Sequence, residues 1–359
     1  MATFGDIAKG FDYGMNAAAK SFDGNNKYIR ITDIDEVSSQ YLYDDVVSPD
    51  GELEDRYLVK ENDILLARTG ASTGKSYLYR NSDGKLYFAG FLIRANIYKH
   101  NSYFVFSQLH TLRYKKWISV MSARSGQPGI NSQEYASFPV YTTSLQEEDK
   151  IATFLKLLDE RIITQNKIIE DLKLLKSAIR KKVFVSLKEE HTESCEINQL
   201  LTYEQPTAYI VTNDEYSTDT TLIPVLTANK GFVLGYTDED FSIYQKGECI
   251  IFDDFTMDAK YVSFPFKVKS SAIKILTAKP NVNLRFMFEY LSYLELKSEE
   301  HKRHYISEIA SLVVELPSKE MQNKIASLMT SLDNKLALEE NTKVKYEDEK
   351  QYQLSQMFI

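Results

Sequence analysis

Apolar side chains recur at alternating spacings of four and three residues from 150 to 184, a pattern typical of an amphipathic helix that packs against a second helix. This apolar seam comprises Ile151, Leu155, Leu158, Ile162, Ile169, Leu172, Ile179 and Val183, interrupted by Gln165 and Lys176. No Pro or Gly occurs from 150 to 186. Because 35 helical residues rise roughly 50 Å, the helix is too long for one small core and needs a partner.

The segment 150–184 returns without a gap as 324–358, 174 positions later. Identical residues at this offset include Lys150 and Lys324, Ile151 and Ile325, Ala152 and Ala326, Leu158 and Leu332, Asp159 and Asp333, Lys176 and Lys350, and Phe184 and Phe358. The second seam holds Ile325, Met329, Leu332, Leu336, Tyr346 and Met357. The shared register predicts an antiparallel coiled coil in a pseudo-twofold molecule; two unrelated surface helices are the alternative.

The segments between these helices are rich in strand formers and repeat the same order of elements. Apolar strands are expected at 28–34 and 221–228, and strands that follow an acidic residue at 63–66 and 248–251. Aromatic helices are expected from 103 and 285, and closing strands at 138–141 and 313–317. We therefore predict an α+β fold with two similar α/β domains, 1–142 and 190–317, and two helical regions, 143–189 and 318–359. Divergent loops on one scaffold suit two recognition tasks.

Net charge alone argues against nucleic acid, since 359 residues carry −8 with a pI near 5.4. The distribution of charge indicates otherwise. Residues 84–133 contain no Asp or Glu but hold Lys85, Arg94, Lys99, Arg113, Lys115, Lys116 and Arg124. Residues 259–288 are likewise free of acids and hold Lys260, Lys267, Lys269, Lys274, Lys279 and Arg285. Because phosphates respond to local potential, these two tracts are compatible with two DNA contacts, although a solvated basic face is the alternative.

Two loops of the first domain have side chains suited to DNA. The loop 68–76, RTGASTGKS, follows an apolar strand, but its glycines enclose three residues where the Walker pattern needs four. The loop 124–132, RSGQPGINS, adds forked polar groups that match base edges; ordinary hairpin turns are the alternative. The candidate DNA-binding residues are Arg68, Thr69, Ser72, Thr73, Lys75, Ser76, Tyr77, Arg94, Arg124, Ser125, Gln127 and Asn131 in the first domain, and Asn229, Lys230, Thr256, Lys260 and Tyr261 in the second.

No catalytic or metal-binding motif is found. Cys195 and Cys249 lack CxxC spacing, and we interpret both as small buried side chains. The five His residues, His100, His110, His191, His301 and His304, show no metal-ligand spacing beyond the i, i+3 pair at 301 and 304, which is more typical of a solvated helix face. The adjacent Asp253 and Asp254 favour a turn or hydrogen-bonding role over a metal site. No signal peptide or membrane span is evident, so we expect a cytoplasmic protein.

The RTGASTGK loop, the SGQPGINSQEYASFPV segment and the helix that starts at LQEEDKIATF together resemble the specificity subunit of type I restriction-modification enzymes. The likeness covers nearly the whole chain, with two target recognition domains and two helical regions in the family's order. The second domain departs from it, because FDDFTMDAKY, 252–261, stands where the first domain has RTGASTGKSY.

The resemblance implies a DNA-reading subunit without catalysis of its own, in which each recognition domain reads one half of a split asymmetric site. The helices, roughly 50 Å long against ~34 Å per DNA turn, would set the unread spacer. It also implies two methyltransferase subunits and restriction subunits as partners, with S-adenosylmethionine, ATP and Mg expected in those partners and no cofactor in this chain. Outer helix residues expected to dock partners are Lys167, Arg180, Lys181 and Lys182.

The sequence alone leaves two other functions open. A protein-interaction scaffold is favoured by the charge of −9 over residues 190–317, where 11 Lys and Arg face 20 Asp and Glu. A steep salt dependence of binding would distinguish DNA from a protein partner. A nucleotide-binding protein is suggested only by Gly70 to Lys75, and an isolated chain that binds no ATP would exclude it.

Overall fold

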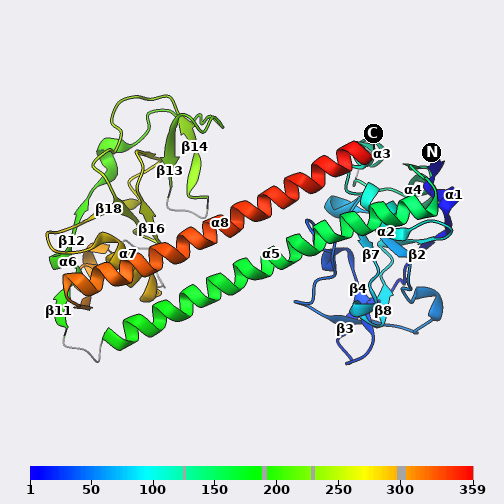
Figure 1. Ribbon diagram of the computed structural model, residues 1–359, viewed down its shortest axis with the longest axis horizontal. Helices are drawn as coiled ribbons and strands as arrows, with labels where there is room; N and C mark the ends of the chain where they lie inside the picture. The colour runs from blue at the N-terminus through cyan, green and yellow to red at the C-terminus, as the bar shows by residue number, and fades with distance from the viewer. Residues whose placement is uncertain (124–126, 188–191, 228–230, 297–304, 359) are drawn as a thin grey trace. The chain divides into compact units, whose positions relative to one another are not determined.

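A computed structural model describes residues 1–123, 127–187, 192–227, 231–296 and 305–358 (Figure 1). The chain divides into two compact units: unit 1 comprises residues 1–166 and 341–359, and unit 2 comprises residues 167–340. The two predicted long helices are present as α5, Leu145–Ser186, and α8, Lys319–Met357. Each unit therefore contains half of each long helix.

Unit 1 is built on a four-stranded antiparallel sheet in the order β2-β9-β6-β7. Its elements before α5 are β1 (Ala2–Thr3), α1 (Phe4–Ile7), β2 (Ala8–Tyr13), β3 (Ala18–Ser21), β4 (Lys27–Ile29), β5 (Val47–Asp50), β6 (Asp63–Ala67), β7 (Ser76–Leu78), β8 (Leu86–Phe88), β9 (Leu92–Ile97), α2 (Ser102–Gln108), α3 (Leu112–Met121), α4 (Ser132–Ala136) and β10 (Pro139–Val140). Strands β4 and β8 form a separate parallel pair. Strand β1 pairs with the closing strand β10.

Unit 2 repeats this topology, with a sheet in the order β12-β18-β15-β16 and a parallel pair of β13 with β17. Its elements between the long helices are β11 (Glu193–Glu196), α6 (Ile197–Leu200), β12 (Leu201–Glu204), β13 (Ile223–Leu226), β14 (Val233–Thr237), β15 (Cys249–Asp253), β16 (Ala259–Val262), β17 (Lys267–Val268), β18 (Ile273–Ala278), α7 (Leu284–Tyr293) and β19 (Val313–Leu316). The first strand, β11, again pairs with the closing strand, β19. The duplication predicted from the order of elements is confirmed.

Two predicted strands are longer than the observed ones. The strand expected at 221–228 is present as β13, Ile223–Leu226, and residue 228 lies outside the described residues. The strand expected at 28–34 ends at Ile29, and residues Ile31–Asp33 form a 3₁₀ helix. The Asp33 carboxylate accepts the backbone N–H of Arg30 at 2.8 Å and also pairs with the Arg30 guanidinium. This local hydrogen bond competes with strand pairing and ends the strand.

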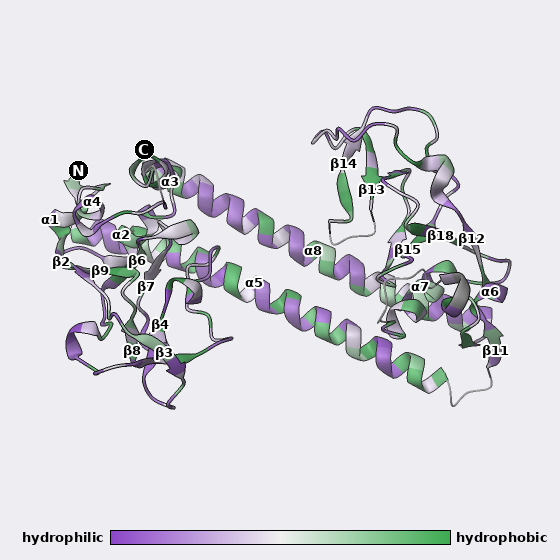
Figure 2. Ribbon diagram, turned by 180° about the vertical axis from the view of Figure 1, so that it is seen from behind, coloured by the Kyte–Doolittle hydropathy of each residue, from purple (hydrophilic) through white to green (hydrophobic). Residues whose placement is uncertain are grey.

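The apolar seam of the long helices is buried within each unit, and Figure 2 shows apolar residues recurring along both helices. In unit 1, Leu155 and Leu158 of α5 and Leu354 of α8 share one core. In unit 2, Ile325, Ala326 and Met329 of α8 pack with Phe184 of α5. Of the other predicted seam residues, Ile169 and Leu336 are buried, and Ile162, Leu172 and Leu332 are half-buried. The burial supports the predicted coiled-coil seam.

Two ion pairs repeat with the sequence. In unit 1, Lys350 of α8 bonds Asp159 of α5 at 2.5 Å. In unit 2, Lys176 of α5 bonds Asp333 of α8. Both the two lysines and the two aspartates are related by the 174-residue offset, so one interaction is used twice with the roles of the helices exchanged. An antiparallel pair of related helices requires this exchange.

The long helices are also anchored to the two scaffolds in an equivalent way. The buried Glu148 of α5 accepts the backbone N–H of Asn101, and the buried Gln322 of α8 accepts that of Asn283, both at 2.9 Å. These asparagines are the N-caps of α2 and α7, respectively. Each cap therefore satisfies the start of a short helix and fixes it to a long one.

His110 is held neutral in unit 1. Its Nδ1–H donates to the carbonyl of Phe106 at 3.1 Å, and its Nε2 accepts from the Ser39 hydroxyl at 3.0 Å. Burial, with the nearby Lys350 ammonium, lowers the pKa of His110 to about 4. Because the unfolded chain binds the proton near pH 6.5 and the folded chain does not, stability is complete above pH 6.5 and falls as the pH drops toward 4.

Replacement His110→Gln is therefore expected to flatten this part of the pH dependence. Between pH 7.5 and 4.5 the free energy of unfolding of the wild type should fall by about 2 kcal/mol more than that of the variant. This figure is smaller than the pKa difference alone would give, because the His110 ring is partly exposed to solvent. Urea unfolding at both pH values measures the difference. Equal losses in the two proteins would contradict the neutral assignment.

Candidate nucleic-acid interface

The two loops singled out in the sequence lie side by side in unit 1. The N–H of Gly70 donates to the carbonyl of Pro128 at 3.0 Å, and the N–H of Ile130 donates to that of Arg68 at 2.9 Å. Thr69 and Gly129 form an antiparallel bridge between these bonds. Residues about 60 positions apart thus form one surface, which we call the paired-loop surface (residues 68–75 and 127–132).

Gly70 and Gly74 are required by the backbone. Both have positive φ, of 68° and 93°, and a Cβ at Gly74 would lie 2.8 Å from Ile118 of α3. The Tyr114 hydroxyl of α3 donates to the Gly74 carbonyl at 3.1 Å. The N–H groups of Gly70, Thr73, Gly74 and Lys75 all donate to carbonyls within the unit. A phosphate cradle needs such groups free, so this geometry does not support the nucleotide-binding hypothesis.

Arg68 lies at the centre of the paired-loop surface. Its guanidinium is 4.9 Å from the ring centroid of Tyr13, and one of its nitrogens donates to the Gly90 carbonyl at 3.4 Å. The Tyr13 hydroxyl accepts the N–H of Ser132 at 3.2 Å, which fixes the ring against the second loop. The cation is therefore held by the Tyr13 ring and the Gly90 carbonyl, and remains half-exposed.

Several candidate residues of the first domain serve the fold instead. Ser76 and Tyr77 are buried in β7, and the Tyr77 hydroxyl donates to Asp83 at 2.5 Å; burial strongly raises the pKa of Tyr77. Arg94 bonds Asp12 across the sheet at 2.8 Å. Asn131 caps α4 by accepting the N–H of Glu134 at 2.9 Å. Strand β7 is only three residues long, too short for its alternation to separate inward from outward side chains.

The other candidates vary in exposure. Gln127 is exposed, whereas Thr69, Ser72, Thr73 and Lys75 are half-buried. The Thr73 hydroxyl already donates to the Gly70 carbonyl at 2.8 Å, and the Lys75 ammonium is 3.7 Å from Glu36. Arg124 and Ser125 lie outside the described residues.

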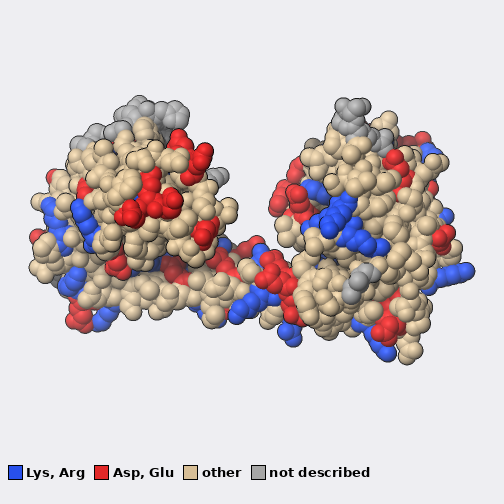
Figure 3. Space-filling view, turned by 90° about the horizontal axis from the view of Figure 1, so that it is seen from above, with Lys and Arg blue, Asp and Glu red and all other residues tan. Residues whose placement is uncertain are grey.

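Helix α3 carries two further cations. They belong to the acid-free tract 84–133 but were not among the candidate DNA-binding residues. Lys115 and Lys116 are exposed on this helix, which packs under Gly74. Among the ion pairs of the described residues, neither lysine has a carboxylate partner. Figure 3 shows Lys and Arg side chains gathered on one face of the unit that contains the N-terminus. The acid-free sequence around α3 was the signal that could have identified them.

In unit 2 the loop equivalent to 68–76 has different chemistry. The buried Asp253 accepts the N–H groups of Phe255 and Thr256 at 2.8 and 3.2 Å, and so shapes a turn. Asp254 bonds the Lys274 ammonium at 3.3 Å, with both side chains 1% exposed. The expected turn and hydrogen-bonding roles of these aspartates are confirmed.

The remaining candidates of unit 2 are dispersed. Thr256 and Lys260 are exposed, and Tyr261 is half-buried with its ring 5.0 Å from the Arg285 guanidinium. Asn229 and Lys230 lie outside the described residues.

Most cations of residues 259–288 are paired within unit 2, which weakens the interpretation of this tract as a basic DNA contact. Partners inside the unit hold five of them: Lys267 with Glu239, Lys269 with Asp214, Lys274 with Asp254, Arg285 with Glu289 and Asp333, and Lys279 with the Asn198 carbonyl. The partners of the first three come from outside the tract, where the local sequence could not reveal them. Of the six cations in this tract, Lys260 is the one whose side chain makes no hydrogen bond or ion pair with another described residue.

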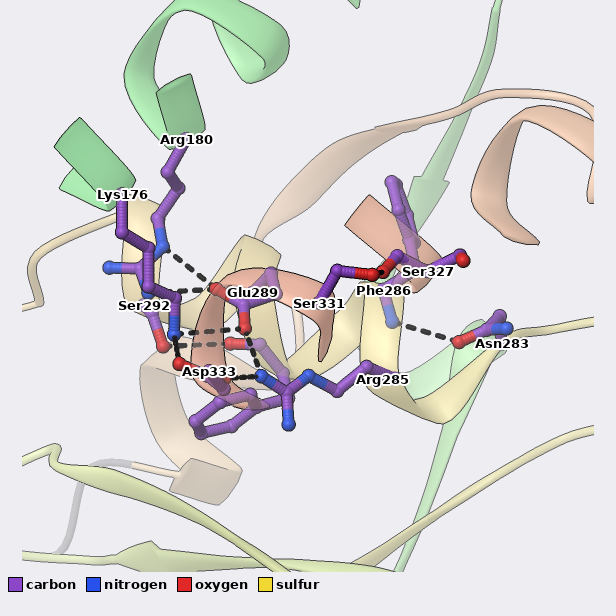
Figure 4. A network of polar contacts seen from close by, with 11 residues as sticks. Lys176, Arg180, Asn283, Arg285, Phe286, Glu289, Ser292, Ser327, Ser331 and Asp333 are labelled. Carbon is purple, nitrogen blue, oxygen red and sulfur yellow. Dashed lines mark hydrogen bonds and ion pairs between the residues drawn. The ribbon is translucent and has the colours of Figure 1, made fainter. Parts of the chain in front are cut away.

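A charge cluster joins α5, α7 and α8 within unit 2 (Figure 4). Glu289, 0% exposed, accepts from Arg180 and from Arg285, both at 2.7 Å, and lies 3.6 Å from the Lys176 ammonium. Asp333 pairs with Lys176 and Arg285. Arg180 therefore faces inward and does not belong to an outer docking face, whereas Lys167, Lys181 and Lys182 are exposed as expected.

Within the described residues, no group of three His, Cys, Asp or Glu side chains could hold a metal ion. In the same part of the chain, no helix combines the length and the apolar character needed to cross a membrane.

Comparison with known proteins assigns the family. The family model described as type I restriction modification DNA specificity domain matches twice, at residues 4–174 and 189–347. The chain belongs to this family. Each match begins at the start of one scaffold and runs into the long helix that follows it.

Particular relatives agree with this assignment. The Escherichia coli type I restriction enzyme EcoR124I/EcoR124II specificity subunit is 39% identical over 142 residues, which are 38% of this chain and 35% of that protein. The crystal structure of the type I restriction-modification S subunit from M. genitalium has a TM-score of 0.67 at 14% identity, covering 99% of this chain and 95% of that one. A chain from a structure on assembly and conformational transition of the type I R-M system has a TM-score of 0.54 at 11% identity, with 97% of each chain covered. These two structures support the fold.

Proposed function

We propose that this protein is the DNA sequence-specificity subunit of a type I restriction-modification complex, without catalysis of its own. It reads a bipartite asymmetric site, one half with the scaffold of unit 1 and the other with that of unit 2. The duplicated scaffold carries the proposal, because both family matches coincide with copies of one sheet whose contact loops differ. By strand pairing Arg68 corresponds to Asp254, two residues after the Phe252 with which the sequence alignment paired it. Different loops on one frame let the two halves recognise different bases.

The long helices are the proposed docking surface for methyltransferase and restriction subunits. Both helices expose large apolar side chains in addition to the apolar seam residues that they bury. These are Leu145, Phe154, Leu157, Ile163, Ile168, Leu174, Leu175 and Val185 on α5, and Leu328, Leu338, Val344 and Tyr352 on α8. Exposed apolar rows of this kind favour helical partners. S-adenosylmethionine, ATP and Mg would be bound by those partners, and the reaction would take place in the cytoplasm.

Co-purification with the methyltransferase subunit encoded beside the gene, followed by mapping of N6-methyladenine in the host genome with and without this protein, tests the proposal. Loss of methylation at one bipartite motif on deletion is expected, and the motif gives both half-sites. An unchanged methylome in a partner-bound protein would favour the scaffold hypothesis.

The cations of α3 should contribute phosphate contacts. The double variant Lys115→Ala, Lys116→Ala is expected to bind the cognate duplex about 10-fold more weakly and to lower the slope of log K against log salt by about 2. Titration of a labelled duplex over a range of salt concentrations measures both quantities. Lys20→Ala is the control, since Lys20 lies on β3, on the opposite side of unit 1 from α3 (Figure 1). A salt slope equal to that of the wild type would remove α3 from the interface.

A further inference from the structure

An aromatic side chain projects from the turn between β8 and β9, beside the paired-loop surface. Phe91 is 58% exposed, and its carbonyl accepts the N–H of Arg68 at 3.0 Å. The ring of Tyr13, on β2, is 42% exposed and lies 4.9 Å from the Arg68 guanidinium. One exposed aromatic ring thus contacts the Arg68 cation, and a second exposed ring belongs to the residue whose backbone carbonyl binds the Arg68 N–H.

The turn that carries Phe91 is held by backbone hydrogen bonds to the end of β2. Gly90 donates to the Met15 carbonyl and Met15 to the Phe88 carbonyl, both at 2.8 Å. Gly14 permits this approach, because a Cβ there would lie 2.2 Å from the Ala89 carbonyl oxygen. Since the backbone is fixed before any ligand arrives, little ordering free energy would be lost when Phe91 contacts one.

Unit 2 shows that the fold does not need an aromatic residue at this place. The N–H of Asp254 donates to the carbonyl of Ala272 at 3.1 Å, the counterpart of the bond from Arg68 to Phe91. The strands on either side, β15 and β18, pair as β6 and β9 do. Phe91 stands where unit 2 has Ala272. Its ring is 58% exposed and is not part of the buried cores of unit 1, so it contributes little to packing. The ring is therefore available to a ligand that binds at the neighbouring paired-loop surface.

We propose that Phe91 stacks on the face of a DNA base in the half-site read by unit 1, with Arg68 bound to the adjacent backbone or base edge; this inference rests on the proposed function. An exposed ring on the residue that is backbone-bonded to Arg68 matches the chemistry of an opened base step, which presents an apolar base face beside a phosphate. Unit 2, with Ala272 and the neutralised Asp254, reads its half-site without this wedge. The two half-sites are thus deformed differently.

The test uses the full chain in complex with its methyltransferase subunit, on the cognate duplex found by methylation mapping. Phe91→Ala copies the residue of unit 2, and Phe91→Tyr keeps the ring. We expect Phe91→Ala to weaken binding about 5- to 100-fold with an unchanged salt slope, and Phe91→Tyr to bind within about 2-fold of wild type. In duplexes with 2-aminopurine at successive positions of the half-site, one position should brighten on binding of wild type and not of Phe91→Ala.

The outcomes separate the inference from the function on which it rests. If wild type binds its duplex with a steep salt dependence but Phe91→Ala matches it in affinity and fluorescence, the stacking role is wrong and the specificity function stands. A lower melting temperature of the Phe91→Ala protein together with weak binding by Phe91→Tyr would make Phe91 a structural residue, and also overturns the inference. A wild-type complex that binds no duplex overturns both.

Discussion

Lys274→Met is expected to lower the free energy of unfolding by about 3–5 kcal/mol, because it leaves the Asp254 carboxylate buried without its cation. The two side chains are each 1% exposed and lie 3.3 Å apart at one end of β15 and β18, the two central strands of the unit 2 sheet. The carboxylate is buried from water, and among the described residues the remaining bond, from the Tyr305 N–H at 2.9 Å, reaches one of its oxygens. Chemical denaturation at pH 7 measures the loss.

A compensated variant isolates the charge from the packing. Adding Asp254→Asn to Lys274→Met removes the stranded charge while keeping a carbonyl that can accept the Tyr305 N–H. Most of the lost stability should return, since a buried ion pair replaced as a whole costs far less than one half of it. A double variant as unstable as Lys274→Met would show that the lysine stem, rather than its charge, matters here.

Glu289→Gln should destabilise unit 2 by a similar amount, about 3–5 kcal/mol. The substitution preserves the volume but removes the carboxylate that contacts Lys176, Arg180 and Arg285. Asp333 then remains as the anion of the cluster for three cations, and it does not contact Arg180. The expected result is a lower midpoint of urea unfolding that worsens at low salt, where repulsion among the cations is least screened.

Unit 1 supplies the design for the rescue. Leu354 of α8, at the 174-residue offset from Arg180, is apolar and buried, and Ser107 stands where α7 has Glu289 when α2 and α7 are aligned on their capping asparagines. Combining Arg180→Leu with Glu289→Gln therefore copies the less charged arrangement and should recover part of the lost stability. If the single variant is as stable as the wild type, the cluster contributes specificity of packing but no net stability.

The sequence predicts the architecture well because its evidence is periodic. A heptad pattern and a fixed offset of 174 residues are properties of long segments, so the seam residues Leu155 and Leu158 could be placed without any loop geometry. The equivalent pairs of Lys350 with Asp159 and Lys176 with Asp333 follow the same register.

The candidate site was less predictable because exposure and pairing are decided by tertiary contacts. Lys267 looked free in a stretch without acids, yet Glu239 neutralises it from a separate segment. Tyr77 follows a loop that does lie at the surface, but its own strand turns it toward Asp83. No local sequence pattern distinguishes Phe91. It was identified only from the hydrogen bond between its carbonyl and the N–H of Arg68, which lies 23 residues earlier in the chain.

The division of the chain has a consequence for the order of events during synthesis. Unit 2 is one continuous stretch, 167–340, whereas unit 1 needs residues 341–358 as well as the first 166. Leu354 and Phe358 belong to the core of unit 1, where the ring of Phe358 lies 5.3 Å from that of Phe104. On the ribosome, the scaffold of unit 1 emerges first. Its core therefore stays incomplete until unit 2 and the end of α8 have been translated. Its unfinished surface is the part of the nascent chain that chaperones would have to protect.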